Sequence, residues 1–413
     1  MSPTFRIERL GGQGDGIARS EAGPVFIRYA LPGETVKAAR SGDRAELIAV
    51  VDAAPQRVPP ACRHFGACGG CALQHLDLAA YNDWKRAKVV EALKARGVEA
   101  PVSALVACAP QTRRRVTLAA RRTASGVLLG YREAMSHRIV DIAECPIARP
   151  EIVARLDDLR GLAAIVAAGA KPLRMAVTAT ASGLDIACEE TGRLADAARL
   201  AATAHVRRAG FARLAVEGEI VVEPRKPVVM FGTIAVEPPP GAFLQATAEA
   251  EDAMAALVGA HLQGAKRVAD LFSGCGTFAL RLAGGAAVHA VEADAAALAA
   301  LDRGFRFAAG LRRVTTERRD LFRRPLPPRE LEGFDGLVFD PPRAGAEEQA
   351  RQIARSSVPR VAAVSCNPVT LARDLAILAE GGYRVVGVTP VDQFLWSAHV
   401  EAVALLEKPR KRR

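Results

Sequence analysis

A cysteine stands between a strand-like run and a helix-like run near the end of the chain. Ser365-Cys366-Asn367-Pro368 follows the apolar residues 361–364 and precedes a helical pattern over Thr370–Leu375. Asn favours the N-cap of a helix and Pro favours its first position, so we expect Cys366 at a helix start. The positive end of a helix dipole favours a thiolate, the form that attacks electrophiles. The pattern therefore predicts a nucleophile, although a small buried cysteine at a strand end fits the same residues.

Four other cysteines have the residue type and spacing of a metal site. Three of them form Cys62-x5-Cys68-Gly69-Gly70-Cys71, and the fourth is Cys145 in Glu144-Cys145-Pro146-Ile147. The glycines allow the loop to fold tightly and to direct its amides at bound sulfide or thiolate. Such a site holds either zinc or an iron–sulfur cluster. Zinc ribbons usually pair two short cysteine knuckles, so one triple and a distant single cysteine fit a cluster better. The remaining cysteines, Cys108, Cys188 and Cys275, are interpreted as structural.

Length and charge limit the class of protein that must position these groups. The chain has 413 residues, more than one core usually covers, so two or three domains are expected. Fifty-six Lys and Arg against 45 Asp and Glu give a net charge of +11. This excess fits a polyanionic partner, and equally a basic surface without one. The longest apolar run, 161–170, is too short for a bilayer, and we recognise no signal peptide, so a cytoplasmic protein with reduced thiols is expected. Residues 408–413 are expected to form a disordered basic tail.

The first 55 residues read as a small all-β unit. A glycine-rich loop occupies Gly11–Gly16, and a tight turn follows at Leu31–Glu34. Small β-barrels of this kind commonly bind RNA or single strands. The expected strands are Phe5–Leu10, Val25–Ile27, Val36–Arg40 and Ala45–Val51.

The middle of the chain predicts a basic helix and a basic sheet. Asp77–Arg96 is helix-like and ends at Gly97; its lysines and arginines favour a solvated basic face over an RNA-facing one. From Arg115, apolar Val116, Leu118 and Ala120 alternate with the other face, which is typical of an antiparallel strand. Arginines on such a face suit phosphates.

From Gly241 onward, strand–helix units predict a Rossmann-like fold. The strand at 267–272 enters Ser273-Gly274-Cys275-Gly276-Thr277 and a helix, and the next strand ends at Glu292. The third glycine of a dinucleotide fingerprint is missing, which favours S-adenosylmethionine over a nicotinamide cofactor. Asp320 follows a third strand, where an acidic residue for the adenine side is expected. The fourth strand ends in Asp340-Pro341-Pro342-Arg343, and a closing hairpin is expected over 383–406.

Four of these patterns together resemble one enzyme family. They are the Gly-x-Gly-x-Gly, Val-Phe-Ile and Leu-Pro-Gly-Glu-x-Val start, the cysteine loop, Asp-Pro-Pro-Arg, and Ser-Cys-Asn-Pro with a later His399-Val400-Glu401. The start is similar to the TRAM domain of RNA-modifying enzymes. The whole chain resembles the RNA uracil-5 methyltransferase family, and specifically its iron–sulfur branch that acts on 23S rRNA.

The resemblance implies a multidomain α/β fold. Residues 1–55 would form a TRAM-like, OB-like β-barrel. Residues 56–240 would form a central α+β domain with the basic antiparallel sheet and the iron–sulfur loop. Residues 241–413 would form the Rossmann-like catalytic domain.

The resemblance also implies roles for site residues. Cys366 would add to C6 of a uridine so that C5 accepts the methyl group of S-adenosylmethionine, and Glu401 would remove the C5 proton. Cys62, Cys68, Cys71 and Cys145 would hold a [4Fe-4S] cluster. His399 is left as structural. The expected contacts of S-adenosylmethionine are Gln245, Phe272, Thr277, Glu292, Asp320 and Asp340.

Two departures from the family pattern affect specific residues. Thr277 stands where family members often carry Asn. Gln393-Phe394-Leu395-Trp396-Ser397 replaces a more usual Met-Phe-Pro-x-Thr, and Trp396 either stacks on an extruded base or packs inside. The target uridine therefore does not transfer directly from the family.

Other functions compete with this interpretation. Asp-Pro-Pro also occurs in adenine and guanine amino-methyltransferases, but an aromatic residue usually follows there, and here Arg343 follows. A non-catalytic RNA-binding assembly factor needs neither Cys366 nor Glu401. A tRNA target stays open beside 23S rRNA. The expected protein is a monomer that binds RNA, with no DNA or membrane partner.

Overall fold

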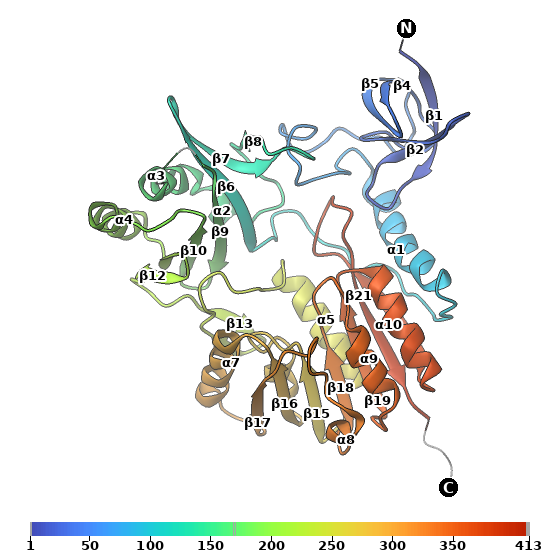
Figure 1. Cartoon of the computed structure of the whole chain (residues 1–413), viewed down its shortest axis with the longest axis vertical. Coiled ribbons are helices and arrows are strands. Elements are labelled where there is room, and N and C mark those ends of the chain that lie inside the picture. Colours follow the sequence, from blue (N-terminus) through green and yellow to red (C-terminus); the bar gives the residue numbers. More distant parts are fainter. Residues whose placement is uncertain (1, 168, 170, 410–413) are drawn as a thin grey trace.

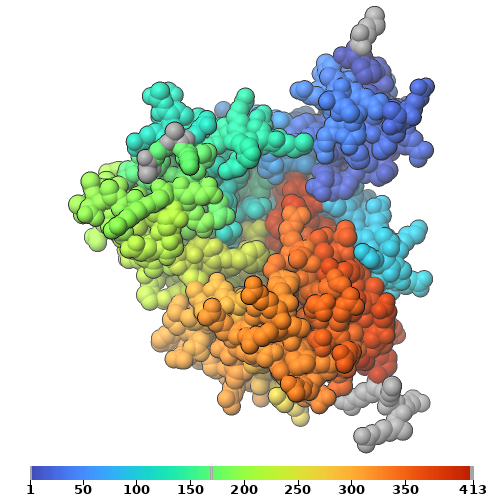
Figure 2. All heavy atoms as spheres, in the orientation of Figure 1, coloured from blue at the N-terminus to red at the C-terminus, as the bar shows by residue number. Residues whose placement is uncertain are grey.

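The computed structural model describes residues 2–167, 169 and 171–409, and Figure 1 shows three β-structures linked by helices. The C-terminal segment lies between the N-terminal barrel and the central sheet (Figure 2). Residues 410–413 of the predicted tail lie outside the described residues. Its first residue, Lys408, is anchored, because its Nζ donates to the carbonyls of Ala354 and Ser356 at 2.8 Å each. Within the described residues, no helix has the length and apolar character needed to cross a membrane.

The N-terminal strands close into a five-stranded barrel in the order β1-β2-β3-β5-β4. Its core is apolar and includes Phe5, Ile7 and Val25. The predicted set of strands lacked β2, which begins at Gly16. A side chain at Gly16 would place Cβ 2.6 Å from the carbonyl oxygen of Ala30, so this strand start requires glycine. The strands are β1 (Thr4–Leu10), β2 (Gly16–Ser20), β3 (Gly23–Ile27), β4 (Thr35–Ser41) and β5 (Arg44–Asp52).

Helix α1 (Leu78–Lys94) follows the cysteine loop and confirms the predicted helix. The side chain of Asp77 accepts a hydrogen bond from Ala80 N at 2.9 Å and caps its first turn. Gly97 has a φ of +66°, a left-handed conformation that glycine adopts without strain, just past the end of the helix. The helix packs beside α10 (Pro368–Glu380), so it contacts the C-terminal half of the chain.

The central part is a seven-stranded sheet in the order β12-β11-β10-β9-β6-β7-β8. The predicted alternation in β6 is confirmed, since Val116, Leu118 and Ala120 are buried. The sheet is antiparallel except for β10 and β11, which run parallel. Its strands are β6 (Arg115–Thr123), β7 (Gly126–Arg132), β8 (Ile139–Asp141), β9 (Leu173–Thr180), β10 (Gly183–Glu189), β11 (Arg213–Val216) and β12 (Glu219–Val222). The helices here are α2 (Pro150–Val153), α3 (Leu156–Val166) and α4 (Asp196–Ala209).

The C-terminal sheet has seven strands in the order β17-β16-β15-β18-β19-β21-β20. The first five are parallel, and β21 runs antiparallel to both of its neighbours, as the predicted closing hairpin requires. The chain runs outward from β15 through β16 to β17, and then returns to place β18 on the other side of β15. The strand order thus reverses between β15 and β18, so ligands are expected outside the carboxyl ends of these two strands. The strands are β15 (Arg267–Leu271), β16 (Ala287–Glu292), β17 (Val314–Arg318), β18 (Gly336–Phe339), β19 (Arg360–Ser365), β20 (Arg384–Val391) and β21 (Glu401–Glu407).

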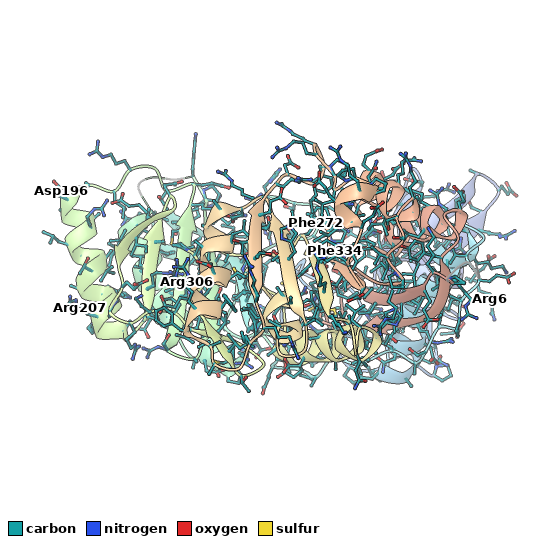
Figure 3. The ribbon with its side chains drawn as sticks, turned by 90° about the horizontal axis from the view of Figure 1, so that it is seen from below. Arg6, Asp196, Arg207, Phe272, Arg306 and Phe334 are labelled. Carbon is teal, nitrogen blue, oxygen red and sulfur yellow. The ribbon has the colours of Figure 1, made fainter. Side chains whose placement is uncertain are left out.

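Helices cover the two faces of this sheet. Buried apolar residues of α9 and α10 join those of β18 and β19 in one core, and α5 packs against β19 and β21. Viewed from below, Phe272 and Phe334 lie between Asp196 and Arg207 of α4 at one end and Arg6 at the other (Figure 3). The remaining elements are α5 (Ala248–His261), α6 (Ala279–Leu282), α7 (Ala295–Phe307), α8 (Pro328–Leu331), α9 (Glu347–Ala354), and the hairpin β13 (Val229–Phe231) and β14 (Ile234–Val236).

Candidate active site

Parallel strands β18 and β19 end at the same edge of the C-terminal sheet. Asp340 follows β18, and Cys366 follows β19. In the antiparallel pairing of β19 with β21, Ser365 lies opposite Ala402, so Glu401 lies at the same edge as Cys366. The charges of Glu401 and Asp340 both act on the thiol of Cys366. The fold therefore brings together the three groups that the sequence singled out for chemistry.

The residues after Cys366 build the expected helix start. Oδ1 of Asn367 accepts a hydrogen bond from Val369 N at 3.1 Å, and Pro368 is the first residue of α10. Nδ2 of Asn367 donates to the carbonyl of Arg343 at 3.1 Å, and the hydroxyl of Thr370 donates to the same oxygen at 3.3 Å. These bonds tie the Asp-Pro-Pro-Arg loop to the cysteine, which fixes the backbone on both sides of the thiol.

The thiol of Cys366 does not have the low pKa that the helix start led us to expect. Burial, together with the charges of Glu401 and Asp340, raises its pKa to about 11, while Arg343 opposes them. The helix dipole acts within one turn and is worth less than burial beside two carboxyl groups. The sulfur therefore carries its proton at neutral pH in the free protein.

The two carboxyl groups at this edge are also perturbed. Burial raises the pKa of Asp340 to about 7, and burial together with the charge of Asp340 raises that of Glu401 to about 8. Glu401 is 3% exposed. Its Oε2 has no hydrogen-bond partner among the described residues, while Oε1 accepts from Gln393. A buried carboxyl with a pKa near neutrality and one free oxygen can exchange a proton.

Two amide side chains connect these carboxyl groups. Nε2 of Gln245 donates to Oδ2 of Asp340 at 2.8 Å. Nε2 of Gln393 donates to Oε1 of Gln245 at 2.6 Å and to Oε1 of Glu401 at 2.8 Å. Gln245 was predicted to contact the cofactor, and the structure places it in this buried chain of hydrogen bonds. Gln393 was noted as a departure from the family, and no role was predicted for it.

The other predicted cofactor residues lie along the same edge of the sheet. Phe272 follows β15 with a φ of +60°, and its ring packs at a tilt against that of Phe322, with the ring centroids 5.5 Å apart. Oε2 of Glu292, at the end of β16, accepts from Gly274 N at 3.0 Å, which shapes the glycine loop that also contains Thr277. Asp320 follows β17 and its Oδ1 accepts from Phe322 N at 3.0 Å.

Sequence reasoning did not single out Asp270, on β15. It is fully buried, and neither of its carboxylate oxygens has a hydrogen-bond partner among the described residues. Burial raises its pKa well above the ordinary value, and the charges of Asp340 and Glu292 add to that effect. The available signal was an acidic residue inside an otherwise apolar strand, Val268-Ala269-Asp270-Leu271.

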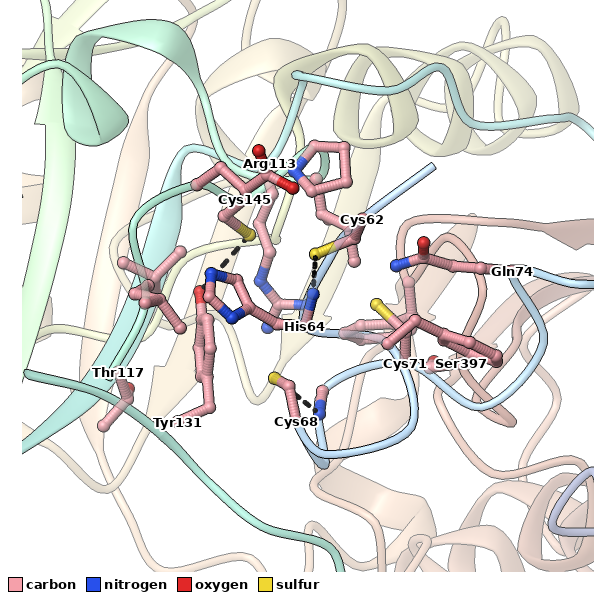
Figure 4. Close-up of a pocket in the computed structure, with 18 of the residues that line it drawn as sticks. Cys62, His64, Cys68, Cys71, Gln74, Arg113, Thr117, Tyr131, Cys145 and Ser397 are labelled. Carbon is pink, nitrogen blue, oxygen red and sulfur yellow. Dashed lines mark hydrogen bonds between the residues drawn. The ribbon is translucent and has the colours of Figure 1, made fainter. Parts of the chain in front are cut away.

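The four predicted ligand cysteines line one cavity of about 320 Å³ (Figure 4). Cys62, Cys68 and Cys71 come from the loop before α1, and Cys145 comes from the segment after β8. Burial raises the pKa of Cys71 to about 12. The hydroxyl of Tyr131 lies 3.9 Å from the sulfur of Cys145.

The amide of Gly70 donates to the sulfur of Cys68 at 3.4 Å. Among the described residues, no three His, Cys, Asp or Glu side chains gather in a group that could hold a metal ion. The chemistry of four thiols around one cavity suits either kind of metal site predicted from the sequence.

The cysteine loop is bonded directly to the segment that precedes Glu401. The backbone amides of Ala72 and Leu73 donate to the carbonyl of Trp396 at 2.8 and 3.1 Å. Trp396 is 7% exposed and packs with Leu395 against Leu73. Of the two expectations for Trp396, internal packing is therefore the one that the structure supports.

Helix α1 holds the same segment from its other side. Arg86, Lys94 and Arg96 of its basic face are exposed, as predicted, but Lys85 is buried. Lys85 and Asp392 form a fully buried ion pair at 2.6 Å, and Nζ of Lys85 also donates to the carbonyl of Phe394 at 3.0 Å. The hydroxyl of Tyr81 donates to Asp392 at 2.8 Å. Lys88 reaches the carbonyls of Gly12 in the barrel and Ala398. Sequence could not show this, because Asp392 is distant along the chain.

The open parallel sheet, its closing antiparallel pair and the residues at its carboxyl edge define a methyltransferase fold. A solved structure agrees over nearly the whole molecule: the tRNA (uracil-54, C5)-methyltransferase of Pyrococcus abyssi, in complex with S-adenosyl-L-homocysteine, has a TM-score of 0.77 and 24% identity. That comparison covers 98% of this chain and 99% of the other.

Sequence relatives then establish the family. Residues 310–409 match the family described as tRNA (Uracil-5-)-methyltransferase. An RNA methyltransferase of Mesorhizobium japonicum is 65% identical over 413 residues, which is 100% of both chains. The 23S rRNA (uracil(1939)-C(5))-methyltransferase RlmD of Halomonas elongata is 34% identical and covers 98% of this chain and 89% of its own. The chain belongs to the RNA uracil-5 methyltransferase family.

Proposed function

We propose that this protein methylates C5 of one uridine in 23S rRNA, with S-adenosylmethionine as methyl donor. The family supplies the reaction class. The observation that supports the mechanism is the meeting of Cys366 with the buried carboxyl of Glu401 at the sheet edge. The rRNA target is favoured because a whole-length relative is named for 23S rRNA, and the tRNA alternative is kept because the family description names tRNA.

In the proposed reaction, the thiol of Cys366 first loses its proton to solvent. The thiolate then adds to C6 of the uridine, so that C5 becomes an enolate carbon. C5 takes the methyl group of S-adenosylmethionine in an in-line displacement, and S-adenosylhomocysteine leaves. The free oxygen of Glu401 removes the C5 proton, the C5–C6 double bond re-forms, and Cys366 leaves as a thiolate. The target base must first be extruded from folded RNA, because C6 is covered in a stacked base.

The proposed site for S-adenosylmethionine, the methyl donor, lies at the carboxyl ends of strands β15, β16, β17 and β18. Glu292 is assigned to the ribose hydroxyls, Asp320 to the adenine side, and Phe272 to packing against the adenine. Asp340, Gln245 and Thr277 complete the proposed contacts. Acidic groups suit this ligand, since it offers hydroxyls, amino groups and a sulfonium rather than a pyrophosphate.

We further propose that Cys62, Cys68, Cys71 and Cys145, which line the cysteine cavity, hold a [4Fe-4S] cluster. Bound there, it would supply a structural cross-link between the cysteine loop and the segment after β8. Iron and sulfide content of anaerobically purified protein tests this. Cys68→Ser should lose the cluster, while Cys188→Ser, a buried cysteine in the central sheet, should retain it.

The remaining assignments follow the same proposal. We assign residues 1–55 to a TRAM-like barrel, 56–240 to the central domain and 241–413 to the catalytic domain, in a cytoplasmic monomer.

A uridine substrate labelled at C5 with deuterium or tritium tests the proposed function. The proposed reaction releases one C5 label per methyl group transferred. An amino-methyltransferase would methylate without releasing it, and a non-catalytic assembly factor would do neither. Mapping of 5-methyluridine in a deletion strain then identifies the position.

A further inference from the structure

The side chain of Gln393 is fixed in one orientation beside Glu401. It is 1% exposed. Its Nε2 donates to Oε1 of Glu401 and to Oε1 of Gln245, and its Oε1 accepts from Ala246 N at 2.5 Å. A flipped amide would set its oxygen against two acceptor oxygens and its nitrogen against a donor. Three simultaneous bonds therefore exclude the other orientation.

The backbone at Gln393 is held as firmly as its side chain. Oδ1 of Asp392 accepts from Phe394 N at 2.7 Å, which closes a tight turn around residue 393. Asp392 is itself buried in the ion pair with Lys85. Gln245 is held from the central sheet, since Arg114 Nε donates to its carbonyl at 3.0 Å. The side-chain amide of Gln393 is therefore held in a fixed position, and Glu401 is hydrogen-bonded to it.

The hydrogen bond divides the two oxygens of Glu401 between different tasks. Oε1 is occupied by Gln393, and Oε2 is left without a partner among the described residues. Donation to a carboxylate stabilises its ionised form, so Gln393 lowers the pKa of Glu401 against burial and the charge of Asp340, which both raise it. The groups that face Glu401 are Asp340 from β18 and Cys366 from β19.

We propose that Gln393 is the positioning residue of this active site: it holds Glu401 in one orientation, so that Oε2 receives the C5 proton. In that step the C5–H bond breaks, its electron pair forms the C5–C6 double bond, and the C6–Sγ bond breaks to release Cys366 as a thiolate. The inference rests on the proposed function. Gln393 acts on the second half of the reaction, after methyl transfer, and leaves the attack of Cys366 unaffected.

Single-turnover kinetics with Gln393→Met test the proposal. Methionine has a similar length, lacks a donor, and is the residue usual at this position in the resembled family. The covalent protein–RNA adduct is followed on denaturing gels across pH 6 to 10. We expect the adduct to form at a near wild-type rate and to decay at least about tenfold more slowly at pH 7.5, with the acid limb of the decay profile raised by about one pH unit.

Gln349→Met is the matched control. Gln349 is also 1% exposed, and its amide also makes two bonds, to the backbone of Leu326, away from the site. This variant should keep the wild-type decay rate and pH profile even if its melting temperature falls. If Gln393→Met does not fold, Gln393→Glu replaces it, because it retains the acceptor for Ala246 N and loses the donor. It should show the same slow decay.

Two results overturn the inference. One is a Gln393→Met adduct that decays at the wild-type rate and pH; the other is equal slowing of adduct formation and decay. A wild-type enzyme that forms no adduct and releases no C5 label instead overturns the proposed function itself.

Discussion

The thiol of Cys366 and the carboxyls of Asp340 and Glu401 occupy one buried sheet edge, where their charges oppose one another. Asp340 raises the pKa of Glu401, and both carboxyls raise the pKa of Cys366, so this edge favours protonated forms at neutral pH. The chemistry that we propose needs a thiolate first and a carboxylate later. A thiol that stays protonated until the target uridine enters the site is protected from reaction with other electrophiles.

Replacement of the nucleophile should stop turnover and leave RNA binding intact. We expect Cys366→Ala to lower methylation on the order of 10⁴-fold or more, because no other group can activate C5. Filter binding and methyl-transfer assays on the same preparation measure the two properties. Cys188→Ala, a buried cysteine in the central sheet, is the control that should retain turnover. A Cys366→Ala protein that still methylates would remove the mechanism.

Replacement of the base should stop the reaction one step later. Glu401→Gln retains the size of the side chain but cannot take the C5 proton, so the methylated adduct should accumulate. The expected observation is a protein–RNA band that survives denaturation and is absent from Cys366→Ala. No such band in Glu401→Gln would contradict the role of Glu401.

The rate of adduct decay should rise with pH through about 8. Burial raises the pKa of Glu401 to about 8, so the carboxyl is mostly protonated at neutral pH and gains its base form as pH increases. Pre-formed adduct shifted rapidly between buffers measures this step separately from thiolate formation. A decay rate that falls over the same range would show that the group acts as an acid.

Residue types identified these groups, but their protonation did not follow from local sequence. Asn367 and Pro368 correctly predicted the helix start at Cys366. The raised pKa of the thiol depends on two carboxyls that only the fold brings near. The bond from Gln393 to Glu401 has the same origin, because it depends on the turn at Asp392.

At the scale of elements, helix α1 and the cysteine loop hold the segment 392–399 from two sides. Lys85 and Tyr81 bind Asp392, and the amides of Ala72 and Leu73 bind Trp396. The helix itself was predictable from its cap and its length. Its buried ionic face was not, since the charges of Asp77–Arg96 read as a solvated pattern without knowledge of Asp392. Strand β2 was not predicted, because its first residue belongs to a glycine-rich run that is typical of a loop.

Loss of the buried lysine should destabilise the molecule through the charge that it leaves behind. Lys85→Met should lower the free energy of unfolding by about 3–5 kcal/mol, because Asp392 would be buried without its cation. Urea unfolding followed by circular dichroism measures the change. The double variant Lys85→Met/Asp392→Asn should recover part of that loss, and Lys94→Met at the end of α1 should cost little. Equal losses in the single and double variants would argue against the ion-pair explanation.

At the scale of the molecule, the barrel, the cysteine loop and the segment 392–399 meet around a cavity of about 370 Å³. Arg28 and Arg44 of the barrel line it, together with Met135, Ser397 and His399. Both arginines form ion pairs with Asp15, at 3.8 and 3.7 Å, and this single carboxylate is shared between two guanidinium groups. With a net charge of +11, this junction is where we expect RNA phosphates beside the site.

Salt dependence of RNA binding measures that contribution. Arg44→Ala should weaken binding and reduce the slope of log K against log salt by about 0.7 to 0.9, the share of one phosphate contact. Arg306→Ala on α7 should leave the slope unchanged, since Arg306 lies in another part of the molecule and pairs with Asp302 (Figure 3). An unchanged slope in Arg44→Ala would exclude the barrel side of the cavity from the RNA path.

The order of strands in the C-terminal sheet has a consequence for folding. β20 precedes β21 in the chain, yet β21 lies between β19 and β20. Until β21 inserts, one edge of β19 and one edge of β20 are unpaired, and Glu401 has not reached the end of the sheet. We expect aggregation of a partly folded chain to begin at these two unpaired edges.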